Sequence, residues 1–297
     1  MSIIKGNIFL LIASFIWGTA FVAQATGMEF IGPLTFTTAR FFLGAITVIP
    51  LLLLYELNSF NKNFRNPGAN LIILIASCGL GFGAIIQQYA LLYTDVSNAA
   101  FITALYVPMV PIALKIFFKK DIHWSIWLAV FLCLLGLYFL TFDASVGTVK
   151  FSDIILIFAA IAFSVQIICT DLYLKKNQAP FTLAFFQYFI VFLATLFPAI
   201  LLEKPTLQGL KAEYFEVFYA GVLSVGIAYT LQIIGQNITK PATTAIILSM
   251  EAVFAAIAGW VIINQTMSET KIFGCFLIFI GIIIAQIFPL KKINKYE

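Results

Sequence analysis

The chain has 297 residues, of which 62% are hydrophobic and only 10% are charged, and its mean hydropathy is +1.04. Soluble domains carry roughly 45–50% apolar and about 25% charged residues, and their surface cannot hide a larger apolar excess. The composition therefore excludes a soluble fold and predicts a polytopic membrane protein. The net charge of +4 does not indicate a nucleic-acid partner. The positions of the lysines between the apolar runs are the informative feature.

Ten apolar runs are long enough to cross a bilayer as helices, which takes about 20 residues each. Helix is favoured because lipid-exposed backbone must satisfy its own hydrogen bonds, and these continuous runs lack the alternation of barrel strands. We predict an all-α integral membrane protein with ten transmembrane helices. The predicted spans are residues 6–26, 33–55, 69–93, 97–118, 124–142, 152–174, 181–202, 215–235, 242–264 and 272–289.

The basic residues between these spans predict the orientation, because cytoplasmic loops are enriched in Lys and Arg. With the N-terminus inside, twelve of the 17 basic residues face the cytoplasm, four face outside and Arg40 lies within a span. This ratio predicts a multi-pass protein of a bacterial-type inner membrane with both termini cytoplasmic. The twelve are Lys5, Lys62, Arg65, Lys115, Lys119, Lys120, Lys175, Lys176, Lys240, Lys291, Lys292 and Lys295.

The chain also aligns with itself at an offset of 143–147 residues. We predict a first five-helix repeat at residues 1–143, a connecting loop at 144–151 and a second repeat at 152–297. An odd number of spans inverts the second repeat, an arrangement typical of secondary transporters that work by alternating access. The matched pairs are Pro33 with Pro180, Arg40 with Gln187, Glu56 with Glu203, Trp17 with Phe163, Pro108 with Glu251, and Gly136 with Gly281.

Two ionisable residues lie deep within predicted spans, where charge is costly and therefore often functional. Glu251, near the middle of the ninth span, could cycle a proton or face a substrate ammonium. A structural alternative is a protonated Glu251 that hydrogen-bonds to a neighbouring helix. Arg40 could bind a substrate carboxylate or pair with another residue of the protein. The repeat-equivalent residue, Gln187, is neutral, which argues against a structural role of Arg40 that both repeats share.

Uncharged polar and aromatic residues in the spans form a second group of candidates for a substrate path. Interhelical hydrogen bonds worth about 0.6 kcal/mol each are the alternative explanation for the amides. We expect some of this group to line a cavity. Its members are Trp17, Gln87, Gln88, Tyr106, Gln166, Gln187, Tyr229 and Gln232.

Sequence signals for an enzyme, a cofactor or a metal are missing. The chain has no GxxxxGK[ST] phosphate loop, and its single histidine, His123, cannot by itself build a catalytic or metal site. Cys78, Cys133, Cys169 and Cys275 sit in separate apolar runs without ligand spacing. We therefore expect a non-enzyme without metal or cofactor, and the sequence leaves its oligomeric state open.

Several motifs together resemble the EamA family of the drug/metabolite transporter superfamily. They are IWGTAF at 16–21, TARFF at 38–42, NAAFITALYVP at 98–108 and AIILSMEAVF at 245–254, followed by Gly274 and Gly281. The resemblance spans nearly the whole chain. It implies ten helices and a central cavity built mainly from spans one, three, four, six, eight and nine. It also implies transport of small organic solutes, often efflux of amino acids or other metabolites.

The ninth span departs from this family pattern, because Ala252 stands where a proline often follows the glutamate. Pro108 and Pro111 predict a kink in span four, whereas span nine has no matching proline.

The functional hypothesis from the sequence is a secondary carrier that exports a small polar metabolite such as an amino acid, with the bilayer as its environment and a proton as a candidate coupling ion. The alternatives are an efflux carrier for drugs or aromatic compounds, a lipid translocator and a non-transporting membrane scaffold.

Overall fold

The computed structural model describes residues 2–57, 67–141, 151–264 and 268–290, and all regular elements in these ranges are helices. Most of the predicted loop 144–151 lies outside the described residues. Six elements are uninterrupted: α1 (Ile3–Thr26), α2 (Pro33–Tyr55), α4 (Pro67–Ala90), α7 (Trp124–Thr141), α8 (Phe151–Asn177) and α15 (Glu269–Leu290). The others are built from pieces: α5 (Val96–Thr103) and α6 (Tyr106–Phe118), α9 (Pro180–Pro198) and η1 (Ala199–Glu203), α10 (Leu207–Ala212), α11 (Tyr214–Phe218), η2 (Tyr219–Tyr229) and α12 (Thr230–Gln236), then α13 (Pro241–Leu248) and α14 (Met250–Ile263).

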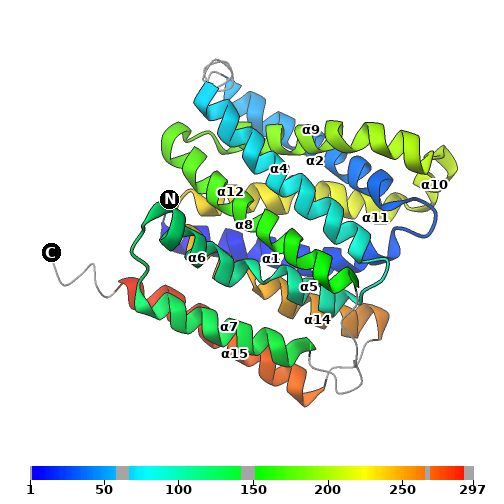
Figure 1. The fold of residues 1–297 in the computed structure, drawn as a ribbon. Coiled ribbons are helices and arrows are strands. Elements are labelled where there is room, and N and C mark those ends of the chain that lie inside the picture. Colours follow the sequence, from blue (N-terminus) through cyan, green and yellow to red (C-terminus); the bar gives the residue numbers. More distant parts are fainter. Residues whose placement is uncertain (1, 58–66, 142–150, 265–267, 291–297) are drawn as a thin grey trace.

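Eight segments of the described chain are long and apolar enough to cross a membrane. The protein is therefore a multi-pass membrane protein, and its outward surface is apolar as lipid contact requires, with Phe117 78% exposed. The predicted fifth and tenth spans correspond to α7 and α15, which are not among the eight, so the count of ten stays a prediction. These two helices lie side by side at one edge of the bundle (Figure 1) and pack closely where Gly136 and Gly281 each face the other helix.

The fourth predicted span is broken between α5 and α6, next to Pro108. Proline has no N–H to donate to the carbonyl four residues back. The Ala104 carbonyl instead accepts from the Val107 N–H at 3.0 Å, and Leu105 N donates to Ile102 O at 3.1 Å. These shorter-range bonds tighten the backbone into a turn, so the predicted kink is a break between two half-helices.

The ninth predicted span is broken at the repeat-equivalent place without a proline. Ser249, between α13 and α14, donates its hydroxyl to the Ile246 carbonyl at 2.7 Å. A serine hydroxyl that occupies a backbone acceptor competes with the helix. The Ala252 N–H then bonds to Ser249 O at 3.1 Å, three residues back. A local side-chain bond therefore accompanies the break here, where the sequence has no proline.

Helices α2 and α9 cap each other. Glu56, which follows α2, accepts the Thr182 N–H at 2.8 Å and the Phe181 N–H at 3.1 Å at the start of α9. Glu203, at the end of η1, accepts the Thr35 N–H at 2.7 Å and the Leu34 N–H at 2.9 Å at the start of α2. Because each helix end reaches the other's beginning, the two helices run antiparallel, as an inverted repeat requires.

Candidate functional site

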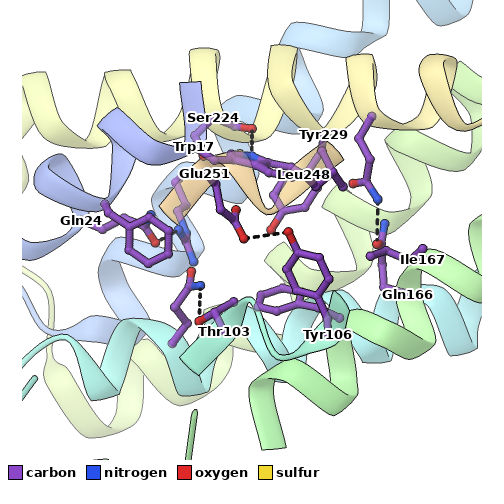
Figure 2. Close-up of a pocket in the computed structure, with 15 residues that line it drawn as sticks. Trp17, Gln24, Thr103, Tyr106, Gln166, Ile167, Ser224, Tyr229, Leu248 and Glu251 are labelled. Atoms are coloured by element: carbon purple, nitrogen blue, oxygen red, sulfur yellow. Dashed lines mark hydrogen bonds between the residues drawn. The ribbon is translucent and has the colours of Figure 1, made fainter. Parts of the chain in front are cut away.

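A small polar cavity lies at the centre of the bundle, where helices of both halves meet (Figure 2). The space that water-sized molecules can occupy there is about 40 Å³. A buried water needs roughly 10–15 Å³ on this measure, so the cavity holds a few waters and no metabolite in this conformation. Its lining residues are Trp17, Phe21, Gln24, Arg40, Gln87, Thr103, Tyr106, Phe163, Gln166, Ile167, Ser224, Tyr229, Gln232, Leu248 and Glu251.

Eight of the ten residues proposed from the sequence lie in this lining, and the other two do not. Gln88 is fully buried and donates to the Gln24 carbonyl at 2.9 Å. Gln187 is fully buried and accepts from the Gln166 amide at 3.1 Å. Both therefore join helices in this conformation. The part that any of the ten plays in transport stays a prediction.

Arg40 enters the cavity from α2, only 4% exposed. Its Nη1 donates to the Gln24 side-chain oxygen, and its Nη2 donates to the Ala84 carbonyl at 3.3 Å. The guanidinium also lies 5.4 Å from the centre of the Phe41 ring, within cation–π range. Among the described residues Arg40 makes no ion pair, and its Nε has no hydrogen-bond partner.

Glu251 enters from the first turn of α14, where the break at Ser249 begins a new half-helix. It accepts the Tyr106 hydroxyl at 2.9 Å, and Tyr106 begins the half-helix α6. Figure 2 shows the two side chains pointing toward each other. The two broken spans, one from each half, thus meet in one hydrogen bond inside the cavity. Discontinuous helices at the centre of the membrane are typical of transporter binding sites.

An aromatic wall closes another side of the cavity. The rings of Trp17 and Tyr229 have their centres 4.5 Å apart, and Trp17 Nε1 donates to the Ser224 carbonyl at 3.2 Å. Ser224 and Tyr229 belong to the π-helix η2, and wide turns of this kind often occur at functional sites. Tyr229 shares the cavity lining with both Arg40 and Glu251. It therefore lies near both charged groups of the cavity.

Close packing fixes the helix that carries Glu251. A methyl group added to Gly18 of α1 would lie 2.8 Å from the Glu251 carbonyl oxygen and 2.8 Å from the Ala255 nitrogen. No side chain fits at that distance, so only glycine lets α1 approach the backbone of α14. Gly18 belongs to the segment at 16–21 that carried the family resemblance.

Sequence reasoning did not select three polar residues of the lining. Gln24 lies near the end of the first predicted span, and its side-chain oxygen accepts a hydrogen bond from Arg40. Thr103 accepts the Gln87 amide at 3.2 Å, and Ser224 offers only its backbone carbonyl to Trp17. For Gln24 the usable signal was an amide within an apolar helix, two residues before the end of α1. Ser224 carried no such signal.

Within the described residues, no group of three or more His, Cys, Asp or Glu side chains is placed to hold a metal ion. His123 precedes α7, and its Nδ1 lies 2.8 Å from the Ser125 hydroxyl. The polar groups of the cavity are one carboxylate, one guanidinium, amides and hydroxyls. This set can recognise the charged and polar groups of a small organic molecule.

Comparisons with known proteins agree with this architecture. The profile of the EamA-like transporter family matches residues 4–142 and, separately, 150–286. An uncharacterized transporter of Archaeoglobus fulgidus is 29% identical over 290 residues, covering 94% of this chain and 84% of the relative. The uncharacterized transporter YwfM of Bacillus subtilis is 26% identical, covering 97% of both chains. A solved crystal structure shares the fold with a TM-score of 0.78 at 17% identity, over 95% of this chain and 96% of that chain.

Proposed function

Because this chain belongs to the EamA-like transporter family, a membrane transporter family, we propose that it is a secondary carrier that exports a small zwitterionic metabolite. An α-amino acid is the substrate class that fits best. Its carboxylate would bind Arg40 and its ammonium would bind Glu251. The lipid bilayer and the solute are the partners that this function needs.

One observation carries this proposal. Arg40 and Glu251 line the same cavity, yet each is held by neutral groups, Arg40 by an amide and a carbonyl and Glu251 by a phenol. Opposite charges buried without a charged partner are costly. A molecule with a carboxylate and an ammonium complements both at once, whereas a purely anionic or cationic solute complements only one. The unbonded Nε of Arg40 leaves a donor available for the carboxylate.

The small size of the cavity supports alternating access. With room for only a few waters, it represents a closed conformation that must widen to admit an amino acid. Charged groups at the interface of two inverted halves are reached from either side when the halves rock against each other. Glu251, in the first turn of a half-helix, is the group we assign to proton coupling.

The same proposal includes ten spans, with repeat boundaries near residues 143 and 152 and both termini in the cytoplasm of a bacterial-type cell. Helix α1 begins and α15 ends on the same side of the bundle (Figure 1). Eight and ten crossings both meet this condition, and the close packing of α7 against α15 is the reason to count these two helices together. The lysine distribution supports the cytoplasmic assignment of that side.

Export of aromatic compounds is the second candidate, and the wall of Trp17 and Tyr229 favours it. Flat apolar solutes would stack on these rings without using Arg40. The two candidates differ in their dependence on charge, because only the zwitterion needs both Arg40 and Glu251.

Counterflow in proteoliposomes tests the proposal. Vesicles preloaded with unlabelled solute receive a panel of labelled amino acids, small carboxylates and aromatic amines, with protein-free vesicles alongside. Saturable exchange of amino acids is expected from the wild type and a strong loss from Glu251→Gln. Glu29→Gln, which removes an exposed carboxylate outside the cavity, should exchange normally. No amino-acid exchange by folded protein would overturn the assignment.

A further inference from the structure

A chain of buried glutamines crosses three helices at one end of the cavity. Gln166 of α8 donates to Gln187 of α9 at 3.1 Å and accepts from Gln232 of α12, also at 3.1 Å. Gln232 lies 3.3 Å from the side-chain oxygen of Gln236, to which it donates. Gln236 in turn donates to the Ile167 carbonyl of α8. Only two of the four, Gln166 and Gln232, line the cavity.

The Ile167 carbonyl determines which way the side-chain amide of Gln232 faces in this row of hydrogen-bonded glutamines. A carbonyl can only accept, so Gln236 must turn its nitrogen toward Ile167 and its oxygen toward Gln232. Gln232 must therefore turn its own nitrogen toward Gln236. The same nitrogen also serves the Gln166 oxygen. The Gln232 side-chain oxygen is left over, and this buried oxygen has no hydrogen-bond partner in the described residues.

The position of this oxygen relates it to the two charged groups. Gln232 follows Tyr229 by three residues, about one helical turn, and so lies on the same face of its helix. Tyr229 lines the same cavity as Arg40 and Glu251. A molecule whose charged end occupies those two groups would extend past the aromatic wall of Trp17 and Tyr229 toward Gln232.

We propose that Gln232 is a specificity-determining residue, and that its free side-chain oxygen selects amino acids whose side chain donates a hydrogen bond, through a hydroxyl or an amide. This inference rests on the proposed function and adds the class of side chain to it. A substrate hydroxyl or amide that reaches this oxygen gives it a hydrogen bond, whereas a methyl group in the same place leaves it unpaired.

Threonine and valine measure this preference directly, because they have nearly the same shape and differ by a hydroxyl in place of a methyl. Leaving a buried acceptor unpaired should cost about tenfold in apparent affinity. The experiment is counterflow with labelled L-threonine and L-valine, each competed by the other, using the full-length protein in proteoliposomes. We expect threonine to be preferred over valine about tenfold.

Three variants assign the preference to this oxygen. Gln232→Leu should bring the threonine-to-valine ratio close to one. Gln232→Met, which keeps an unbranched side chain of similar length but has no amide oxygen, should do the same and serves if Gln232→Leu does not fold. Gln88→Leu is the matched control, since Gln88 is another buried glutamine with an unpaired oxygen but does not line the cavity. It should keep the wild-type ratio.

The outcomes separate the two levels of the proposal. Equal exchange of threonine and valine by the wild type, or a ratio that Gln232→Leu and Gln232→Met leave unchanged, would overturn the role of Gln232 while leaving an amino-acid carrier. If the folded protein exchanges no amino acid at all, both the role of Gln232 and the proposed amino-acid transport are overturned.

Discussion

The two repeats are alike at the helix ends that Glu56 and Glu203 cap, which we call the rim, and differ in the cavity, which we call the centre. At the rim, Glu56 and Glu203, 147 residues apart, perform the same task on α9 and α2 in turn. At the centre, the equivalent pair Arg40 and Gln187 has diverged, since one is a charged residue of the cavity and the other an amide buried between helices. Pro108 and Glu251 have diverged as well. Structural roles are thus kept symmetric, and the residues we assign to the substrate are not.

The largest expected effect comes from making the centre symmetric. Arg40→Gln gives both halves the same residue and removes the one cation that the described residues bring to the cavity lining. Hydrogen bonds to a charged group contribute about 1.5–3 kcal/mol, so amino-acid exchange should fall about 100-fold. Initial rates of counterflow measure this, with Lys5→Gln, which removes an exposed cation of α1, as the control. Exchange within threefold of wild type would mean that Arg40 is structural.

A second variant of the centre tests coupling. Glu251→Gln keeps the hydrogen bond from Tyr106 but removes the charge and the exchangeable proton. Exchange should slow about tenfold, because the ammonium loses a charged partner. Flux should also stop responding to an imposed pH gradient, which fluorescence of a trapped pH dye reports. A normal response to the gradient in this variant would exclude Glu251 as the coupling group.

Gly18 and Ser164, which directly follow the matched pair Trp17 and Phe163, are repeat equivalents that should differ in tolerance to substitution. Gly18→Ala forces α1 away from α14, because the added methyl would lie 2.8 Å from backbone atoms. Overpacking of this kind costs about 1–3 kcal/mol, which should lower the thermal unfolding temperature in detergent by several degrees. Ser164→Ala removes only a hydroxyl bonded within its own helix and should be nearly neutral. Equal shifts in both variants would contradict the asymmetry.

The smallest effects are expected at the rim. Glu56→Gln and Glu203→Gln each weaken a cap at a helix N-terminus, which should cost about 1 kcal/mol of stability. The loss should be slightly larger for Glu56, which also accepts the Thr182 hydroxyl at 2.9 Å. Thermal unfolding of both variants measures the losses, and exchange should stay within about twofold of wild type. A 100-fold loss of exchange in either variant would place the rim within the transport mechanism.

Much of the rim could be predicted from the sequence, and less of the centre. The spacing of Pro33 and Glu56 repeats in Pro180 and Glu203, so both capped helices follow from simple alignment. Family membership also followed from motifs that the family profile confirms. The break at Ser249 could not be foreseen, because a serine in an apolar helix usually fits without breaking it.

The choice among glutamines shows a second limit of sequence reasoning. Gln87 and Gln88 are neighbours, and successive residues of a helix point about 100° apart, so their surroundings can differ. Of the two, Gln87 lines the cavity and Gln88 does not, and helical geometry alone does not say which residue will do so. The orientation of the Gln232 amide depends on Gln236 and Ile167, which bond across two helices far apart in the sequence. Such a network exists only once the bundle is assembled.

The central claim is that Arg40 binds the carboxylate of a zwitterion. The most direct test changes the ligand carboxylate and Arg40 separately and together. The dissociation constants of an exchanged amino acid and of its carboxamide derivative are measured by calorimetry with wild-type protein and with Arg40→Gln. The account predicts that wild type binds the amino acid at least tenfold more tightly than the carboxamide, and that Arg40→Gln binds the two about equally. Discrimination of the same size in Arg40→Gln would contradict it.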